Sequence, residues 1–320
     1  MNKILNFSNV YMDSNSTYIF ENLNEKEYLK NTLRLCQKRM GDNFNEFDFY
    51  IFSNHNNSVP ASASIQNKKR KILIYISDEA AHSPAFLSEK YFAIFKSYIG
   101  SKYSKHNSNI FPFPLGYVNC FKANSEIKLE DRQYDVFFSG NLNYSRWRFY
   151  KECSYLSLVP DFLYYRLMLR PTWRKQLVKL VGTDFTSTSK RWYVKFNKGF
   201  KTGLDIETYS SILSRSKIVL SPKGFESTET FRLTEALSCG CIVVSEGLPN
   251  VPFYQKSPII QVENWREGLA VAKALLKQPA RLVQLQQESI KWWNDNLSDS
   301  GVSRYIVMSI KQLSEKNKLV

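Results

Sequence analysis

The chain has 320 residues, enough for two domains with separate cores, and 43% of its residues are hydrophobic, as in a globular protein. No run of about 18 apolar residues occurs, which excludes a membrane-spanning helix, and the start MNKILNF has too short an apolar run for a signal peptide, so a cytoplasmic location is predicted. The net charge of +15 requires either an anionic partner or a solvated cationic surface.

Positive charge is concentrated between Arg146 and Lys201, where 13 Lys and Arg residues stand against three acids. An anionic membrane surface or a nucleic acid could bind such a region. No zinc-ligand spacing, aromatic RNA-binding strand or helix-turn-helix pattern accompanies the charge, which disfavours nucleic acid. A peripheral position at the inner face of a membrane and a solvated cationic surface remain the two alternatives.

The five cysteines are scattered along the chain and lack the spacing of metal ligands. Cys239 and Cys241 flank Gly240, where small residues suit a turn from a helix to a strand. We therefore expect reduced thiols and no metal site.

The first half alternates apolar runs with one amphipathic helix. Strands are expected at 4–7, 47–52 and 72–76, a helix at 25–40, and a strand or buried helix at 91–95. Strands alternating with helical segments indicate an α/β domain with a parallel sheet.

Polar side chains follow the best strand of this half. Asp78, Glu79 and His82 come directly after Ile72–Ile76, and ligands of open α/β sheets collect outside the carboxyl ends of the strands. A carboxylate or imidazole at this edge could act as a general base. Alternatively, Asp78 or Glu79 caps the next helix.

A proline-containing stretch at 109–117 and a polar stretch at 122–133 separate the two halves, and the boundary is expected near residue 125. The later half again alternates strands and helices. Strands are expected at 134–138, 217–220, 241–244 and 257–262, a short one at 179–182, and helices at 204–216, 265–277, 279–296 and 303–315.

The stretch 216–248, SKIVLSPKGFESTETFRLTEALSCGCIVVSEGL, predicts a strand, a loop, a helix and a second strand. Ser227 or Thr228 is the expected helix N-cap, and Gly240 the left-handed residue after the helix. Arg232 and Glu235 are three apart and share one helix face.

A guanidinium and a carboxylate beside a glycine-containing loop suit a nucleoside diphosphate. Phosphate binds amide N–H groups, helix N-termini and guanidinium groups, and ribose hydroxyls bind a carboxylate. The alternative for Arg232 and Glu235 is an ordinary ion pair on a solvated helix face.

The segment SRSKIVLSPKGFESTETFRLTEALSCGCIVV resembles the C-terminal segment of exostosin-like glycosyltransferases. The resemblance is clear over about residues 205–250 and weaker over 134–150. It implies an α/β fold of the GT-B type, with two Rossmann-like domains whose mostly parallel sheets face a central cleft. Residues 1–125 would form the acceptor-side domain and residues 126–320 the nucleotide-sugar-binding domain, with the last helices packing back on the first.

The resemblance also implies roles for individual residues. Lys223 and the loop amides at Gly224 would lie near phosphate, Arg232 would clamp it, Glu235 would face the ribose and Phe225 the base. The donor loop also includes Ser221 and Glu226, and the loop after the strand 134–138 would face the diphosphate with Gly140, Asn141 and Arg146. The separation of Glu226 and Glu235 is one residue longer than in retaining families with two glutamates on this loop, so an inverting reaction is expected.

The expected activity is transfer of a sugar from a nucleotide-sugar, UDP-linked rather than GDP-linked, to a hydroxyl of a surface polysaccharide or lipid-linked oligosaccharide. No cofactor and no metal is expected, because no DxD motif stands in a strand-loop context. A fucosyltransferase-like enzyme using a GDP-sugar is an alternative. A basic nucleic-acid-binding protein and a catalytically silent glycan-binding protein are alternatives from other classes.

Overall fold

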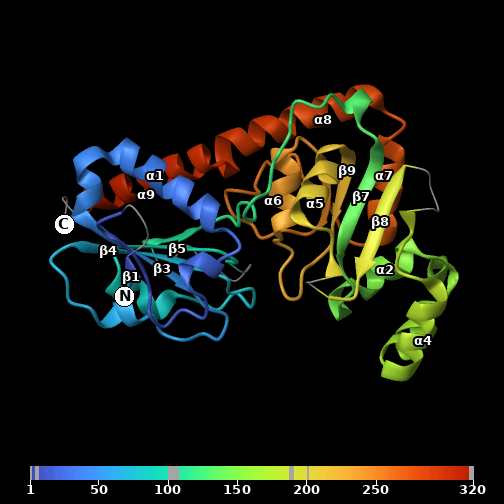
Figure 1. The fold of residues 1–320 in the computed structure, drawn as a ribbon, viewed down its shortest axis with the longest axis horizontal. Helices are drawn as coiled ribbons and strands as arrows, with labels where there is room; N and C mark the ends of the chain where they lie inside the picture. The colour runs from blue at the N-terminus through green and yellow to red at the C-terminus, as the bar shows by residue number, and fades with distance from the viewer. Residues whose placement is uncertain (1, 4–6, 100–107, 187–190, 200–201, 317–320) are drawn as a thin grey trace. The chain divides into compact units, whose positions relative to one another are not determined.

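The computed structural model describes residues 2–3, 7–99, 108–186, 191–199 and 202–316. The chain forms two compact units. The first unit comprises Met1–Asn119, Pro249–Gln255 and Trp293–Val320, and the second comprises Cys120–Leu248 and Lys256–Trp292. Each unit is built around one sheet (Figure 1), and each is described separately below.

The first unit holds a six-stranded sheet in which the strands follow one another in chain order. Only β1 is antiparallel to its neighbour; the other pairs are parallel. Strand β3 is buried along its whole length, which explains its continuous run of apolar residues. The strands are β1 (Asn2–Lys3), β2 (Val10–Met12), β3 (Phe47–Ser53), β4 (Arg70–Ile76), β5 (Ala93–Lys96) and β6 (Ile110–Pro112).

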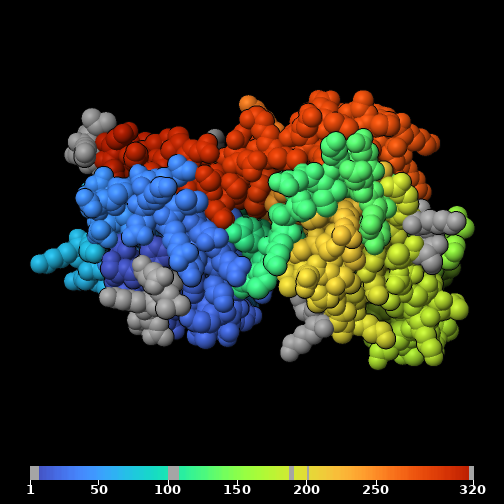
Figure 2. Space-filling model, turned by 45° about the horizontal axis from the view of Figure 1, so that its top comes forward, coloured from blue at the N-terminus to red at the C-terminus, as the bar shows by residue number. Residues whose placement is uncertain are grey.

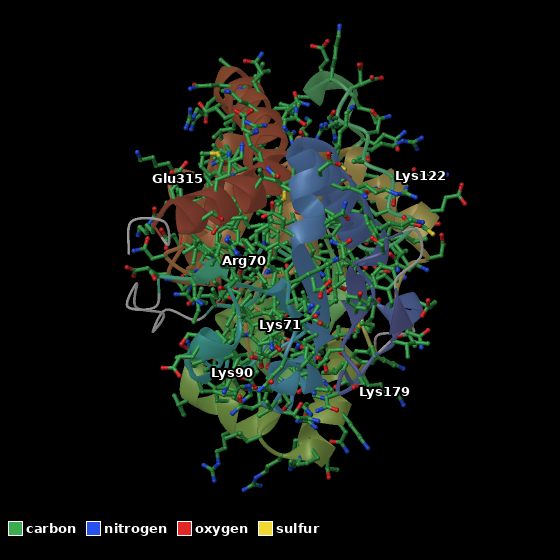
Figure 3. The ribbon with its side chains drawn as sticks, turned by 90° about the vertical axis from the view of Figure 1, so that its left-hand side faces the viewer. Arg70, Lys71, Lys90, Lys122, Lys179 and Glu315 are labelled. Atoms are coloured by element: carbon green, nitrogen blue, oxygen red, sulfur yellow. The ribbon has the colours of Figure 1, made fainter. Side chains whose placement is uncertain are left out.

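Helices α1 (Lys26–Met40) and α9 (Asp299–Lys316) lie side by side in this unit (Figure 1). Arg39 donates from Nε to Ser303 Oγ at 3.0 Å and from Nη2 to Ser300 Oγ at 2.8 Å. The end of the chain therefore completes the first unit. Figure 3 labels Arg70 and Lys71 at the start of β4, where Lys71 Nζ donates to the carbonyls of Ser62 and Ile65 at 2.8 Å each.

Glu25, the residue before α1, is a buried carboxyl whose burial raises its pKa from 4.5 to about 7. Between these values the folded chain holds a proton that the unfolded chain has released, so the free energy of unfolding falls as pH rises. This group alone should lower it by about 3 kcal/mol between pH 4 and pH 8. Asp299, whose pKa burial raises to about 6, adds a slope of the same sign.

We predict that Glu25→Gln reduces this pH dependence without abolishing it, as measured by urea midpoints at the two pH values. Glu21→Gln, an exposed glutamate in the same unit, is the matched control and should leave the dependence unchanged. Equal slopes for the wild type and Glu25→Gln would show that Glu25 is charged in the folded chain.

The second unit holds a five-stranded sheet in the order β11-β10-β9-β7-β8, and all its neighbours are parallel. From β7 the chain passes to β8 on one side and then crosses to β9 on the other, so strand order reverses between β7 and β9. Ligands of open α/β sheets bind at such a switch point. The strands are β7 (Tyr134–Asn141), β8 (Trp192–Asn197), β9 (Ser216–Ser221), β10 (Ile242–Glu246) and β11 (Ile260–Val262).

The helices of this unit bury apolar residues against the sheet, where Phe138, Phe149 and Phe196 form the centre of an aromatic cluster. The helices are α2 (Trp147–Cys153), α3 (Asp161–Met168), α4 (Pro171–Val181), α5 (Ile206–Ser214), α6 (Phe231–Ser238), α7 (Trp265–Leu275) and α8 (Pro279–Trp292). The predicted α/β class with mostly parallel sheets is confirmed.

The buried guanidinium of Arg132 holds the strand and the helix of the 216–248 segment together. Arg132 donates from Nη1 to the Ser216 carbonyl at 2.7 Å and from Nη2 to the Cys239 carbonyl at 2.6 Å. It thereby joins the start of β9 to the end of α6. Gly240 has φ +65°, as predicted, and an added Cβ there would lie 2.7 Å from Ile290 Cγ1.

Two local predictions differ from the structure, and a third lies mostly outside the described residues. Helix α6 begins at Phe231 after Thr230, not after Ser227 or Thr228, because Ser227 Oγ instead accepts from the Glu229 amide at 3.1 Å within the loop. The expected strand at 179–182 is the last turn of α4, which Gly182 ends with φ +85°. Residues 4–6 of the strand expected at 4–7 lie outside the described residues.

Within the ranges that the structure describes, no helix has both the length and the apolar composition that crossing a bilayer requires.

Candidate functional site

The predicted donor residues converge at the switch point of the second sheet. Gly140 and Asn141 end β7, Ser221 ends β9, and the two strands pair directly. The loop that starts at Pro222 leads from β9 to α6, so the carboxyl ends of both strands and the N-terminus of the helix lie at one edge. Such an edge suits an anionic ligand.

Arg232 is the most distinctive side chain at this edge. Its Nη2 donates to the Ser139 carbonyl at 2.5 Å, and its guanidinium carbon lies 4.8 Å from the centre of the Phe138 ring. The Nε and Nη1 groups are buried and have no hydrogen-bond partner among the described residues. Buried N–H groups that lack a partner are costly, and a guanidinium with such groups at a strand edge suits an anionic ligand.

Gly140 leaves the space that this guanidinium occupies. A Cβ added at Gly140 would lie 2.6 Å from Arg232 Nη2 and 3.0 Å from Arg146 Nη1. Any side chain at this position would displace one of the two guanidinium groups, so glycine is required here by close approach.

Burial lowers the pKa of Arg232, while the electrostatic interactions with Tyr209 and Glu235 raise it. Glu235 is itself buried, and its Oε2 accepts a hydrogen bond from the Tyr209 hydroxyl at 2.9 Å. Arg232 and Glu235 therefore do not form the solvated ion pair of the alternative interpretation. The prediction that Glu235 faces a ribose has no support in this geometry, because Tyr209 of α5 binds its carboxylate.

Arg146 holds the loop in place instead of projecting from it. Its Nε donates to the Lys223 carbonyl at 2.8 Å and its Nη1 to the Asn141 carbonyl at 2.9 Å. The side chain is 7% exposed. It therefore joins the ends of β7 and β9, and the phosphate contact expected of it stays a prediction.

The loop between β9 and α6, here called the donor loop because it is expected to bind the sugar donor, is held by hydrogen bonds of its backbone. The Lys223 amide donates to Glu246 Oε2 at 2.7 Å, the Gly224 amide to the Ser227 carbonyl at 2.7 Å, and Ser145 Oγ to the Phe225 carbonyl at 2.6 Å. The Lys223 ammonium forms no hydrogen bond or ion pair within the described part of the chain. Phe225 and Glu226 are exposed on the same loop.

The N-terminus of α6 lacks a side-chain cap. Thr230 occupies the N-cap position, but its hydroxyl bonds Ser221 Oγ at 3.0 Å and not a helix amide. The Leu233 amide donates to the Thr230 carbonyl at 3.1 Å, which leaves the Phe231 and Arg232 amides at the positive end of the helix dipole. Together these groups offer a diphosphate a guanidinium, an ammonium and backbone amides.

A second polar cluster lies at the carboxyl edge of the first sheet. Asp78 is fully buried and accepts from Lys96 Nζ at 2.7 Å (Oδ2), from the His82 amide at 2.9 Å (Oδ2) and from His82 Nδ1 at 2.7 Å (Oδ1). Lys96 is also buried, with Nζ 4.3 Å from the centre of the Tyr75 ring. Asp78 and Lys96 thus form a buried ion pair.

His82 is the accessible member of this cluster, with its side chain 35% exposed. In the neutral tautomer that donates from Nδ1 to Asp78, the lone pair of the imidazole is on Nε2, which has no partner in the portion of the chain described. Ser77 and Ala81 have φ of 69° and 57°, so the turn that holds Asp78 is strained at two non-glycine residues. Glu79 lies in the same turn.

Sequence reasoning missed Lys96, Tyr209 and Ser139. Lys96 ends the apolar run AIFK, and a lysine there is the signal of a paired buried charge. Tyr209 and Ser139 gave no such signal. Among the described residues no cluster of three or more His, Cys, Asp or Glu side chains could hold a metal ion.

No family model matches the chain, and no curated protein matches it. Solved structures with partial likeness include the GtfA/B complex (11% identity, 89% of this chain, TM-score 0.48), a glycosyltransferase from Rickettsia africae ESF-5 (12%, 95% of this chain and 97% of that chain, 0.46) and WaaG, a glycosyltransferase involved in lipopolysaccharide biosynthesis (10%, 94% and 99%, 0.46). The chain spans 60% of the GtfA/B chain that it matches.

Proposed function

We propose that the chain is a nucleotide-sugar-dependent glycosyltransferase of GT-B architecture. The observation that carries the proposal is the Arg232 guanidinium, which holds two buried, unpartnered N–H groups at the switch point of a parallel sheet. A nucleoside diphosphate supplies the anionic oxygens that these groups lack.

The second unit would bind the donor through its leaving group. When the acceptor hydroxyl oxygen attacks the anomeric carbon, the bond from that carbon to the diphosphate oxygen breaks, and the diphosphate keeps the electron pair. Arg232, the Lys223 ammonium and the α6 amides would stabilise this developing charge. Phe225, exposed on the donor loop, would contact the nucleobase.

The first unit would supply the general base. His82 Nε2 takes the proton of the acceptor hydroxyl, and Asp78 is a positioning residue that fixes the imidazole tautomer. Asp78 itself is less suited to this role, because its carboxylate oxygens already bond Lys96 Nζ and the amide and Nδ1 of His82. Of the three general-base candidates that the sequence offered, Asp78, Glu79 and His82, we therefore propose His82.

We propose a UDP-sugar in preference to a GDP-sugar, a surface polysaccharide or lipid-linked glycan as acceptor, an inverting outcome and transfer without metal. Cationic side chains and helix amides would carry the leaving charge in place of a metal ion.

A thermal-shift panel tests the proposal. A ligand that binds only the folded chain raises the melting temperature by mass action. UDP, GDP, CMP and the matching nucleosides are compared in the presence of EDTA. We expect at least one diphosphate to raise the melting temperature and its nucleoside to have little effect. No shift with any diphosphate, together with salt-sensitive binding of DNA or RNA, would replace this proposal with a nucleic-acid-binding function.

A further inference from the structure

Nearly half of the exposed large apolar side chains lie in one short part of the second unit. Of the 15 that are exposed among the described residues, seven lie between residues 155 and 180. Leu158 and Leu180 are 88% and 85% exposed, so they gain nothing from the core. The seven are Tyr155, Leu158, Phe162, Leu163, Leu169, Trp173 and Leu180.

The 155–180 segment consists of a 3-10 turn (Tyr155–Leu158), α3 and the greater part of α4. Part of the segment packs on the unit: Leu156, Tyr164 and Met168 are buried, and Leu177 and Val178 pack against the core. Helix α4 has no fully buried residue, and Figure 1 shows it extending away from the sheet. In Figure 2 the yellow-green part of the chain lies at the outer end of its unit. The remaining side chains of the segment are mostly exposed.

Basic side chains alternate with these apolar ones. Arg166, Arg170, Lys175 and Lys179 form no ion pair in the described ranges. The segment has one acid, Asp161, which pairs with Lys151. Its outer side is therefore both apolar and uniformly cationic.

We propose that the 155–180 segment docks on an anionic phospholipid bilayer, with Phe162, Leu169, Trp173 and Leu180 among the headgroups and the four free cations beside lipid phosphates. Helices with Trp, Phe and Leu among Lys and Arg bind the bilayer interface in this way. A protein partner is disfavoured because lysine is depleted from the centres of protein interfaces. A nucleic acid is disfavoured because its backbone offers exposed leucines no apolar partner. The proposal is independent of the glycosyl transfer function.

Co-sedimentation of the full chain with vesicles tests the docking surface. Phosphatidylcholine vesicles are compared with vesicles that also contain phosphatidylglycerol. We expect sedimentation with the anionic vesicles and much less with the neutral ones. Phe162→Ser/Leu169→Ser/Trp173→Ser should lose at least about tenfold in partition coefficient, because apolar burial drives insertion.

Matched controls separate this surface from general effects. Val283→Ser/Met308→Ser removes exposed apolar groups elsewhere and should bind as the wild type does. Lys175→Glu/Lys179→Glu should lose at least about tenfold, and the charge-matched Lys38→Glu/Lys311→Glu should lose clearly less. Because all substituted residues are exposed, circular dichroism should show an unchanged fold.

The proposal is overturned if the wild type does not sediment with anionic vesicles, or if the apolar triple variant binds as well as its control. If the wild type fails to bind and light scattering shows a dimer that the triple variant lacks, the segment is instead an interface between copies of the chain.

Discussion

Replacing Arg232 with glutamine should weaken binding of the preferred nucleoside diphosphate at least about 30-fold. Hydrogen bonds to charged groups contribute about 1.5–3 kcal/mol each, and the neutral, shorter Gln side chain cannot replace the Nε and Nη1 donors of the guanidinium. A loss of about 2 kcal/mol of binding free energy corresponds to an increase in Kd of about 30-fold. Isothermal titration calorimetry of the wild type and the variant measures it.

Arg232→Lys is the companion variant, since it keeps a positive charge beside the buried Glu235 and so protects the fold. We expect an intermediate loss, because an ammonium lacks the planar fork. Arg281→Gln, which removes an arginine from the exposed end of α8, is the control and should bind normally. Normal affinity in Arg232→Gln would remove Arg232 from the site.

Replacing His82 with asparagine should lower the rate of sugar transfer, or of donor hydrolysis without acceptor, by about 100-fold to 10,000-fold. General base catalysis contributes an effect of this size. Affinity for the nucleoside diphosphate should remain unchanged, because its proposed ligands belong to the second unit. Rate assays and calorimetry on the same preparation separate the two effects.

His55→Asn is the matched control for this prediction. His55 is an exposed histidine in the same unit, and its ring lies 6.4 Å from that of Tyr18. The control should retain the wild-type rate. An unchanged rate in His82→Asn would exclude His82 as the base and return the role to Glu79 or to another group.

Most strands were predictable because they are short apolar runs separated by polar loops, but β6 (Ile110–Pro112) and β8 (Trp192–Asn197) were not predicted. The run IVL after Lys217 and the run IVV after Cys241 are buried on both sides of a parallel sheet, and such strands show no alternation. The start of α6 was misplaced because Ser227, Thr228 and Thr230 all suit an N-cap. In the structure the Ser227 and Thr228 hydroxyls bond the Glu229 amide and the Gly247 carbonyl, and the helix begins after Thr230.

The sequence predicted which residues lie at this edge of the sheet, but not the contacts that each of them makes. Arg146 and Arg232 are both arginines near a glycine loop, and only the fold shows that Arg146 bonds two carbonyls whereas Arg232 keeps unpartnered N–H groups. Asp78 and His82 were found from their place after a strand. The Lys96 contact depends on the pairing of β4 with β5, which places Tyr75 opposite Lys96.

The central claim is that Arg232 and the β9-α6 loop bind a diphosphate. A crystal structure of the chain with the diphosphate that gives the largest thermal shift tests it most directly. The claim predicts phosphate oxygens within hydrogen-bonding distance of Arg232 Nε and Nη1. A diphosphate bound elsewhere, with those two groups still without a ligand, would contradict it.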